Sequence, residues 1–186
     1  GCPSQSGDRQ TPATPSPQPS VSPVEVVPSQ SELSVKSTYS MGEEILYGDE
    51  LGSQARIRVT GMRAIEGKDT VRQPQSGNRW LAVSLEIANR GDRAFIVTFE
   101  QVKLADRQGR IYEQSLVAQS TLAQQLQPIP PGQVATGEVA FELPKDANAA
   151  KLVYDPLADS CESHDNSLSK FYPCDRFPAI VKLESK

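Results

Sequence analysis

Three cysteines and a single histidine carry the most distinctive chemistry in this sequence. Cys161 and Cys174 lie near the C-terminus, with twelve residues between them, in a loop too polar to be held by a hydrophobic core. Closing such a loop with a disulfide stabilises a fold by about 3 kcal/mol in the chain-entropy model. The alternative is a metal site that includes His164, but structural zinc needs four ligands, usually in close pairs, and that spacing does not occur. We therefore predict a disulfide.

Cys2 stands apart from this pair, at the other end of the chain. Gly1-Cys2 resembles the last two positions of a bacterial lipobox, where a signal peptidase cleaves before the cysteine and the sulfur receives a diacylglycerol. On this interpretation a hydrophobic signal sequence precedes Gly1. The alternative is that Gly1 is an expression remnant and Cys2 an ordinary thiol. We expect lipidation, with palmitate among the acyl chains, at Cys2.

Acidic residues near the two C-terminal cysteines are candidate oxygen ligands for calcium. A calcium loop of the EF-hand type alternates such ligands and has glycine at its sixth position, and this segment has neither feature. A solvated, charged loop explains the acidic residues better, so we predict neither a metal nor another cofactor. The candidate ligands are Asp155, Asp159, Glu162 and Asp165.

No group of residues predicts a reaction. Histidine is the commonest general acid or base near neutral pH, and only His164 is present. The sequence contains no Gly-x-Ser-x-Gly elbow, His-Glu-x-x-His motif or phosphate-binding glycine loop. The adjacent carboxylates Glu43 and Glu44 lie in a polar segment, where such pairs are usually solvated. We predict no catalytic residue and no enzymatic activity.

Aromatic residues beside Cys174 are candidates for binding a partner. Phe171, Tyr172 and Phe177 flank this cysteine together with two prolines, and exposed aromatic side chains often anchor protein interfaces. The alternative is that they fold back over the core. Elsewhere, Arg90-Gly91-Asp92 has the sequence of an adhesion tripeptide, but a hairpin turn requires residues of these types as well.

Composition excludes some partners and divides the chain in two. The net charge of −4, with 19 basic and 23 acidic residues interleaved, argues against nucleic-acid binding. No apolar run is long enough to span a bilayer. Residues 1–38 are rich in Pro, Ser, Gln and Thr, which predicts a disordered linker, whereas aromatic residues begin at Tyr39. We predict one folded domain over residues 39–186, in a monomer.

Short alternating apolar runs in this second part predict an antiparallel β-sandwich of about seven strands. In the clearest run, Trp80–Asn89, every second residue is apolar and large. Gly61 is expected to mark a bulge, and residues 116–127, with Leu122 and Leu126 four apart, to form a helix over a sandwich edge. The other predicted strands are Ala55–Ile65, Ala94–Phe99, Val102–Leu104, Ile111–Tyr112, Val134–Leu143, Lys151–Tyr154 and Ala179–Leu183.

These motifs resemble the immunoglobulin-like domain of unknown function found in many bacterial surface lipoproteins. The resemblance covers residues 41–183 and rests on three segments. It implies an immunoglobulin-like sandwich, export and lipidation, and it supplies no site residues. The segment 155–178, which contains both C-terminal cysteines, is an addition to the simpler members. The three segments are Met41–Glu44, Trp80–Asn89 and Pro131–Pro144.

Together these features predict a membrane-tethered, non-enzymatic lipoprotein of the bacterial cell envelope. We expect the lipid to hold it at the membrane, facing the periplasm, a lumen or the exterior, and the domain to bind or assemble with a protein partner there. The alternative is a surface lipoprotein that binds a small ligand or ion, and a third possibility is a spacer or inhibitor-like domain without a ligand.

Overall fold

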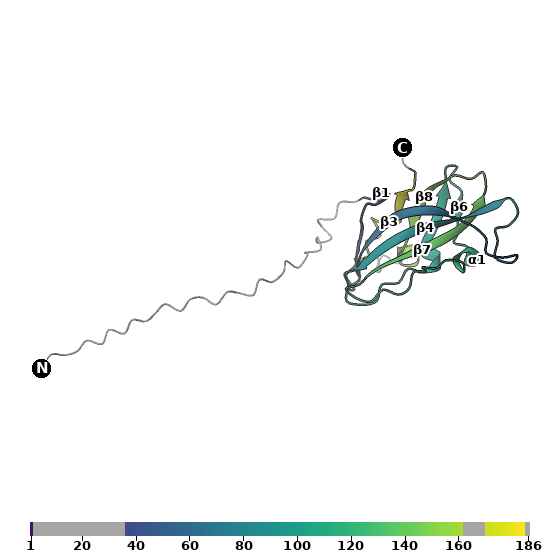
Figure 1. Ribbon diagram of the computed structural model, residues 1–186. Helices are drawn as coiled ribbons and strands as arrows, with labels where there is room; N and C mark the ends of the chain where they lie inside the picture. Colours follow the sequence, from purple (N-terminus) through teal and green to yellow (C-terminus); the bar gives the residue numbers. More distant parts are fainter. Residues whose placement is uncertain (2–35, 162–169, 185–186) are drawn as a thin grey trace. The chain divides into compact units, whose positions relative to one another are not determined.

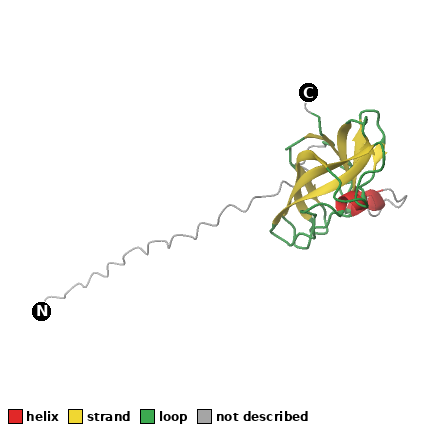
Figure 2. Cartoon of the chain, turned by 45° about the vertical axis from the view of Figure 1, so that its right-hand side comes forward, coloured by secondary structure: helices red, strands yellow, loops and turns green. Residues whose placement is uncertain are grey.

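Strands dominate the part of the chain that the computed structural model describes, which is Gly1, residues 36–161 and residues 170–184. These residues form nine strands and three short helical segments (Figures 1 and 2). None of the helices described is long and apolar enough to cross a membrane. The strands are β1 (Thr38–Ser40), β2 (Ile45–Gly48), β3 (Gln54–Ile65), β4 (Asn78–Asn89), β5 (Val102–Asp106), β6 (Ile111–Tyr112), β7 (Val134–Pro144), β8 (Ala149–Tyr154) and β9 (Ala179–Lys182); the helical segments are η1 (Phe99–Gln101), α1 (Leu116–Gln119) and α2 (Ala158–Cys161).

Two sheets form the predicted β-sandwich. One sheet has five strands in the order β1-β9-β8-β5-β6, and the other has four in the order β2-β3-β4-β7. Neighbouring strands are antiparallel except β1 and β9, which are parallel. The long strands β3, β4 and β7 lie side by side in Figure 1. The fold class predicted from the alternating runs is confirmed. The sandwich has more strands than expected, because β1 and β2 are too short to show an alternating pattern in the sequence.

The period of two in the sequence determines which side chains form the core. On β4, Leu81, Val83, Leu85 and Ile87 are at most 4 % exposed and belong to one large apolar cluster between the sheets. Burying side chains of this size is the main favourable term in folding. The register between β3 and β4 shifts between Val59 and Gly61, which confirms the predicted bulge.

The predicted strand over residues 94–99 is wrong. Only Phe95 pairs there, as an isolated bridge with Ile129. The reason lies at Asn89, whose buried side-chain amide donates to the carbonyl oxygens of Arg93 and Ile129, each at 2.7 Å, and accepts from the amide of Gly91 at 2.9 Å. These bonds hold the chain in a compact turn as it leaves β4, so no hairpin strand follows.

The predicted helix over residues 116–127 is also largely wrong. Helix α1 ends after one turn, and residues 113–127, which we call the strap, run along the free edge of β7. The side chain of Gln119 accepts from the amide of Ala140 at 2.9 Å and donates to the carbonyl of Glu138 at 2.9 Å. A residue of a neighbouring parallel strand would make the same pair of bonds. Pairing with the strand edge therefore replaces the expected helix and protects an edge that would otherwise be open.

Besides the edge of β7, the strap covers part of the outer face of the four-stranded sheet. Leu122 and Ala118 pack there against Trp80, which is 1 % exposed, in a second small apolar cluster with Ala82 and Ala140. The Trp80 indole donates to Glu142 at 2.7 Å.

Candidate functional site at the disulfide end

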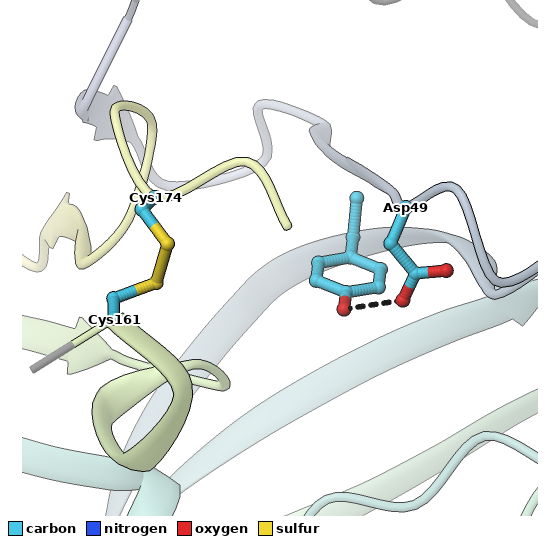
Figure 3. Close-up of a disulfide and its surroundings, with 4 residues drawn as sticks. Asp49, Cys161 and Cys174 are labelled. Atoms are coloured by element: carbon cyan, nitrogen blue, oxygen red, sulfur yellow. Dashed lines mark hydrogen bonds between the residues drawn. A yellow bond between two sulfur atoms is a disulfide. The ribbon is translucent and has the colours of Figure 1, made fainter. Parts of the chain in front are cut away.

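Cys161 and Cys174 are joined in the predicted disulfide, with Cα atoms 5.6 Å apart (Figure 3). Cys161 is the last residue of α2, which follows β8, and Cys174 lies in the segment that leads into β9. Both residues are half-buried. The bridge therefore fixes the approach to β9 against the end of β8, and we call residues 49–53, 157–161 and 170–177 around it the disulfide end.

Phe177 lies in the core, so its assignment as a partner-binding residue is wrong. It is 7 % exposed, and its ring centroid is 5.6 Å from that of Tyr47 and 6.1 Å from that of Tyr154. Phe95 extends the same group, with its centroid 5.9 Å from that of Tyr47. Phe177 therefore follows the alternative given above, in which an aromatic residue beside Cys174 folds back over the core. It does so because the bridge directs the chain after Cys174 inward.

Phe171 has the opposite environment. Its side chain is 41 % exposed, whereas its carbonyl oxygen accepts a hydrogen bond from the amide of Glu50 at 3.1 Å. Tyr172, its neighbour, is half-buried and packs against the core. Phe171 is therefore held in place by backbone bonding while its ring faces solvent.

The turn after β2 places a second apolar side chain at this end. Asp49 accepts from the hydroxyl of Tyr47 at 2.7 Å, the dashed line in Figure 3. It also accepts from the amides of Leu51 at 2.9 Å and Ser53 at 3.0 Å. Leu51, fixed by this turn, is 42 % exposed and adjacent to Glu50. Leu51 was not among the predicted site residues, since nothing in the sequence places residues 49–53 beside residue 171.

Two buried tyrosines in the core next to the disulfide end stay neutral. Burial, and then the hydrogen bond to Asp49, raises the pKa of Tyr47 far above its usual range. Burial alone raises the pKa of Tyr154, whose hydroxyl has no hydrogen-bond partner among the described residues. Neither hydroxyl is thus set up as a base or nucleophile near neutral pH.

The candidate calcium ligands are not brought together in the described part of the chain. Asp155 is half-buried, and its backbone amide donates to the carbonyl of Gln101 at 2.8 Å. The side chain of Asp159 and the whole of Glu162, His164 and Asp165 lie outside the described residues. Among the residues that are described, no three His, Cys, Asp or Glu side chains are placed to hold a metal ion.

The remaining candidates lie elsewhere. Glu43 pairs with Lys36 and Glu44 with Arg56, so the two carboxylates do not act on one point. The hydrogen bond from Lys36 lowers the pKa of Glu43. The turn Arg90–Asp92 packs against the turn 52–54, where a Cβ atom on Gly91 would lie 2.7 Å from the carbonyl oxygen of Gly52. Close packing therefore requires glycine at this position. Cys2 lies outside the described residues.

Comparison with known proteins gives one family. The family described as "Domain of unknown function (DUF4352)" matches residues 48–162, from the last residue of β2 to the residue after Cys161. No curated protein sequence matches the chain.

Two solved structures have a similar fold. One is MPT63, a secreted protein from Mycobacterium tuberculosis, with a TM-score of 0.52 and 14% identity over 63% of this chain and 88% of that protein. The other is the yjhA protein from Bacillus subtilis, with a TM-score of 0.52 and 17% identity over 78% of this chain and 99% of that protein. At these identities the similarity concerns the fold.

Proposed function

The chain belongs to the DUF4352 family of domains of unknown function, and from this premise we propose that it is a lipid-tethered, non-enzymatic binding module of the bacterial cell envelope. In this proposal the lipid on Cys2 holds the domain at a membrane, facing away from the cytoplasm. The domain recognises another protein there through the disulfide end.

Two observations support an extracytoplasmic location. The Cys161–Cys174 bridge belongs to an oxidising compartment, because the bacterial cytoplasm keeps most thiols reduced. MPT63, which shares the fold, is described as a secreted protein. The Gly1-Cys2 pair adds a candidate attachment site for the lipid.

The exposed ring of Phe171 is the single observation that carries the binding proposal. Large apolar side chains on a surface are costly to hydrate, and interface anchors are often aromatic residues on a rigid support. Phe171 has such a support, since its backbone bonds to Glu50 and Cys174 lies three residues further on. Leu51, also exposed, follows Glu50 in the chain, so a partner that covers the ring of Phe171 could reach both side chains in one contact.

The test is crosslinking on intact membranes of cells that make the full chain. We expect one dominant crosslinked protein neighbour, and we expect its yield to fall at least tenfold with Phe171→Ala. Val71→Ala is the matched control, because Val71 is also an exposed apolar residue, at 83 %. It lies in the loop after β3, outside the disulfide end, whereas the residues of that end nearest in sequence lie in the turn before β3. Cys2→Ser should release the chain from the membrane fraction.

Several outcomes would contradict the proposal. Random crosslinking to abundant membrane proteins, or an equal loss with Phe171→Ala and Val71→Ala, argues against a specific surface at the disulfide end. A chain that stays in the membrane after Cys2→Ser is not tethered by that residue. A rise in melting temperature with calcium or a small molecule, without a protein neighbour, would favour the ligand-binding alternative.

A further inference from the structure

Three lysines gather on the outer face of the five-stranded sheet. Lys151 of β8 lies directly opposite Lys182 of β9 in the strand register. Lys103 of β5 pairs with Val153, two residues along β8 from Lys151, and is therefore a diagonal neighbour of Lys151. Side chains directly opposite each other in an antiparallel pair have Cβ atoms about 5 Å apart, and those on the diagonal about 7–8 Å. The three ammonium groups therefore belong to one cluster, which we call the lysine face.

No residue that the structure describes neutralises this cluster. Within the described part of the chain, neither Lys103, Lys151 nor Lys182 forms an ion pair or a side-chain hydrogen bond. The carboxylates at its rim are engaged, since Glu184 pairs with Arg107 at 2.8 Å and Asp106 accepts from its own turn and from Tyr112. Like charges directly opposite each other destabilise a sheet.

Apolar side chains share this face with the lysines. One row across the sheet runs through Lys103, Val153, Ile180 and Thr38, and Val153 and Ile180 are both half-buried. The next row ends at Ile111, which is 55 % exposed. Lysine stems beside branched apolar side chains make a surface that is positive and partly apolar, as at water–lipid boundaries.

We propose that the lysine face rests on the anionic headgroups of the membrane that holds the chain, a step that depends on the lipid tether of the proposed function. Charge complementarity is the first argument, because a protein with a net charge of −4 nevertheless places three lysines together on this face, none of them in an ion pair with a described residue. The second argument is where the chain enters. The segment from Cys2 joins the domain at β1, the edge strand of the same five-stranded sheet.

The consequence is a defined orientation of the tethered domain. With the lysine face on the lipid, the four-stranded sheet points away from the membrane. Each lysine near an anionic surface strengthens binding about fivefold, so three together give roughly a hundredfold. This is weak for a free protein but sufficient for one that a tether keeps close to the surface.

The experiment attaches the full chain through the Cys2 thiol to maleimide lipid in vesicles, the other two cysteines being bridged. Energy transfer from Trp80, the single tryptophan, to dansyl-labelled headgroups reports how near the domain lies. We expect stronger transfer on vesicles that contain phosphatidylglycerol than on phosphatidylcholine alone. The difference should vanish in about 1 M salt, where the screening length falls to about 3 Å.

The decisive variant is Lys103→Gln/Lys151→Gln/Lys182→Gln, which should give equal transfer on both kinds of vesicle. As an untethered Cys2→Ser chain it should also bind phosphatidylglycerol vesicles roughly a hundredfold less than the same chain with its lysines. The matched control is Lys68→Gln/Arg93→Gln/Lys145→Gln, which removes the same charge from exposed loop positions and should behave like the unmodified chain.

Equal transfer on the two vesicles, or equal losses in the two triple variants, would overturn the proposal. The proposal would also be overturned if the chain did not bind vesicles but crosslinked to an acidic protein, and if this crosslink were lost in the lysine-face variant. Because the attachment to lipid is chemical, none of these results depends on lipidation in cells. An unmodified Cys2 in cells would instead overturn the tether of the proposed function, while the vesicle result would still stand.

Discussion

The two outer faces of the sandwich manage charge in opposite ways. On the four-stranded sheet Arg58 lies directly opposite Glu86 and pairs with it, and Arg63 reaches Glu138 through two hydrogen bonds of 2.8 and 2.9 Å. On the five-stranded sheet the directly opposed residues are Lys151 and Lys182. Both faces carry long charged side chains on strands, so strand structure alone does not explain the difference.

The comparison extends to apolar groups. The four-stranded sheet covers its outward-facing Trp80 with the strap, whereas the five-stranded sheet leaves Val153 and Ile180 half-exposed between lysines. One face is thus closed by the chain's own residues. The other has charge and apolar surface that an external, negatively charged partner would complement.

Removing Trp80 should have the largest effect on this contrast. Trp80→Ala leaves a cavity under the strap and removes the indole bond to Glu142, so we expect the free energy of unfolding to fall by about 3–5 kcal/mol. Urea denaturation measures this. Val153→Ala on the other face is the control and should cost about 1 kcal/mol or less, since its side chain is half-exposed. Equal losses of unfolding free energy in the two variants would mean that burial of Trp80 under the strap does not stabilise the fold.

Gly137 tests how closely the strap must approach β7. A Cβ atom at this position would lie 2.7 Å from Leu126 Cδ2 and 2.9 Å from the Leu126 backbone nitrogen. We expect Gly137→Ala to cost about 1–3 kcal/mol, because a backbone atom cannot move aside as a flexible side chain can. Gly61→Ala, which has open space around its Cβ position, should cost less in the same denaturation measurement. Exchange of the Ala140 amide hydrogen should also accelerate in Gly137→Ala if the strap lifts.

The sequence was sufficient for the sandwich because its strands alternate clearly. The alternation in Trp80–Asn89 predicts which side chains enter the core, and Gly61 predicts the bulge. The failures at residues 94–99 and 116–127 have a common physical cause. In both, side-chain amides, from Asn89 and Gln119, satisfy backbone groups of residues distant in sequence, and periodicity contains no record of such bonds.

The site was predictable only in its covalent part. The polar surroundings of Cys161 and Cys174 were enough to predict the bridge. Phe177 turns inward with the chain after Cys174, whereas Phe171, before Cys174, leaves its ring exposed. The hydrogen bond at this end joins Phe171 to Glu50, the neighbour of Leu51, across 121 positions of sequence. The lysine face was missed because it exists only once β5, β8 and β9 are adjacent.

Reversing one charge on each face should give effects of opposite sign. Lys182→Glu places a carboxylate opposite Lys151 and should raise the melting temperature, and Glu86→Lys places an ammonium opposite Arg58 and should lower it. Net charge predicts the reverse, because −4 becomes −6 in Lys182→Glu and −2 in Glu86→Lys. Melting temperatures at low salt therefore separate the local register effect from overall repulsion. Stabilisation by Glu86→Lys would show that the cross-strand pairs contribute little.

The smallest expected effect concerns acid. The hydrogen bonds from Arg63 lower the pKa of Glu138, so the folded state holds this carboxylate charged to a lower pH than the unfolded chain does. The stability from the pair is therefore complete above the unfolded value of about 4.3 and is lost as the pH falls through the lower folded value. Arg63→Gln should thus reduce the free energy of unfolding at pH 7 by less than about 1 kcal/mol. The difference in stability between this variant and the unmodified chain should shrink towards pH 3.

Arg93→Gln provides the control for this pH dependence. Its partner Asp92 lies 3.5 Å away and is 74 % exposed, so its loss should change stability little at any pH. If the gap between Arg63→Gln and the unmodified chain stayed constant from pH 7 to pH 3, Arg63 would act by packing across the sheet rather than by charge. The four-stranded face would then differ from the lysine face in its contacts and not in its electrostatics, because a self-neutralised face must lose stability in acid when its carboxylates are protonated.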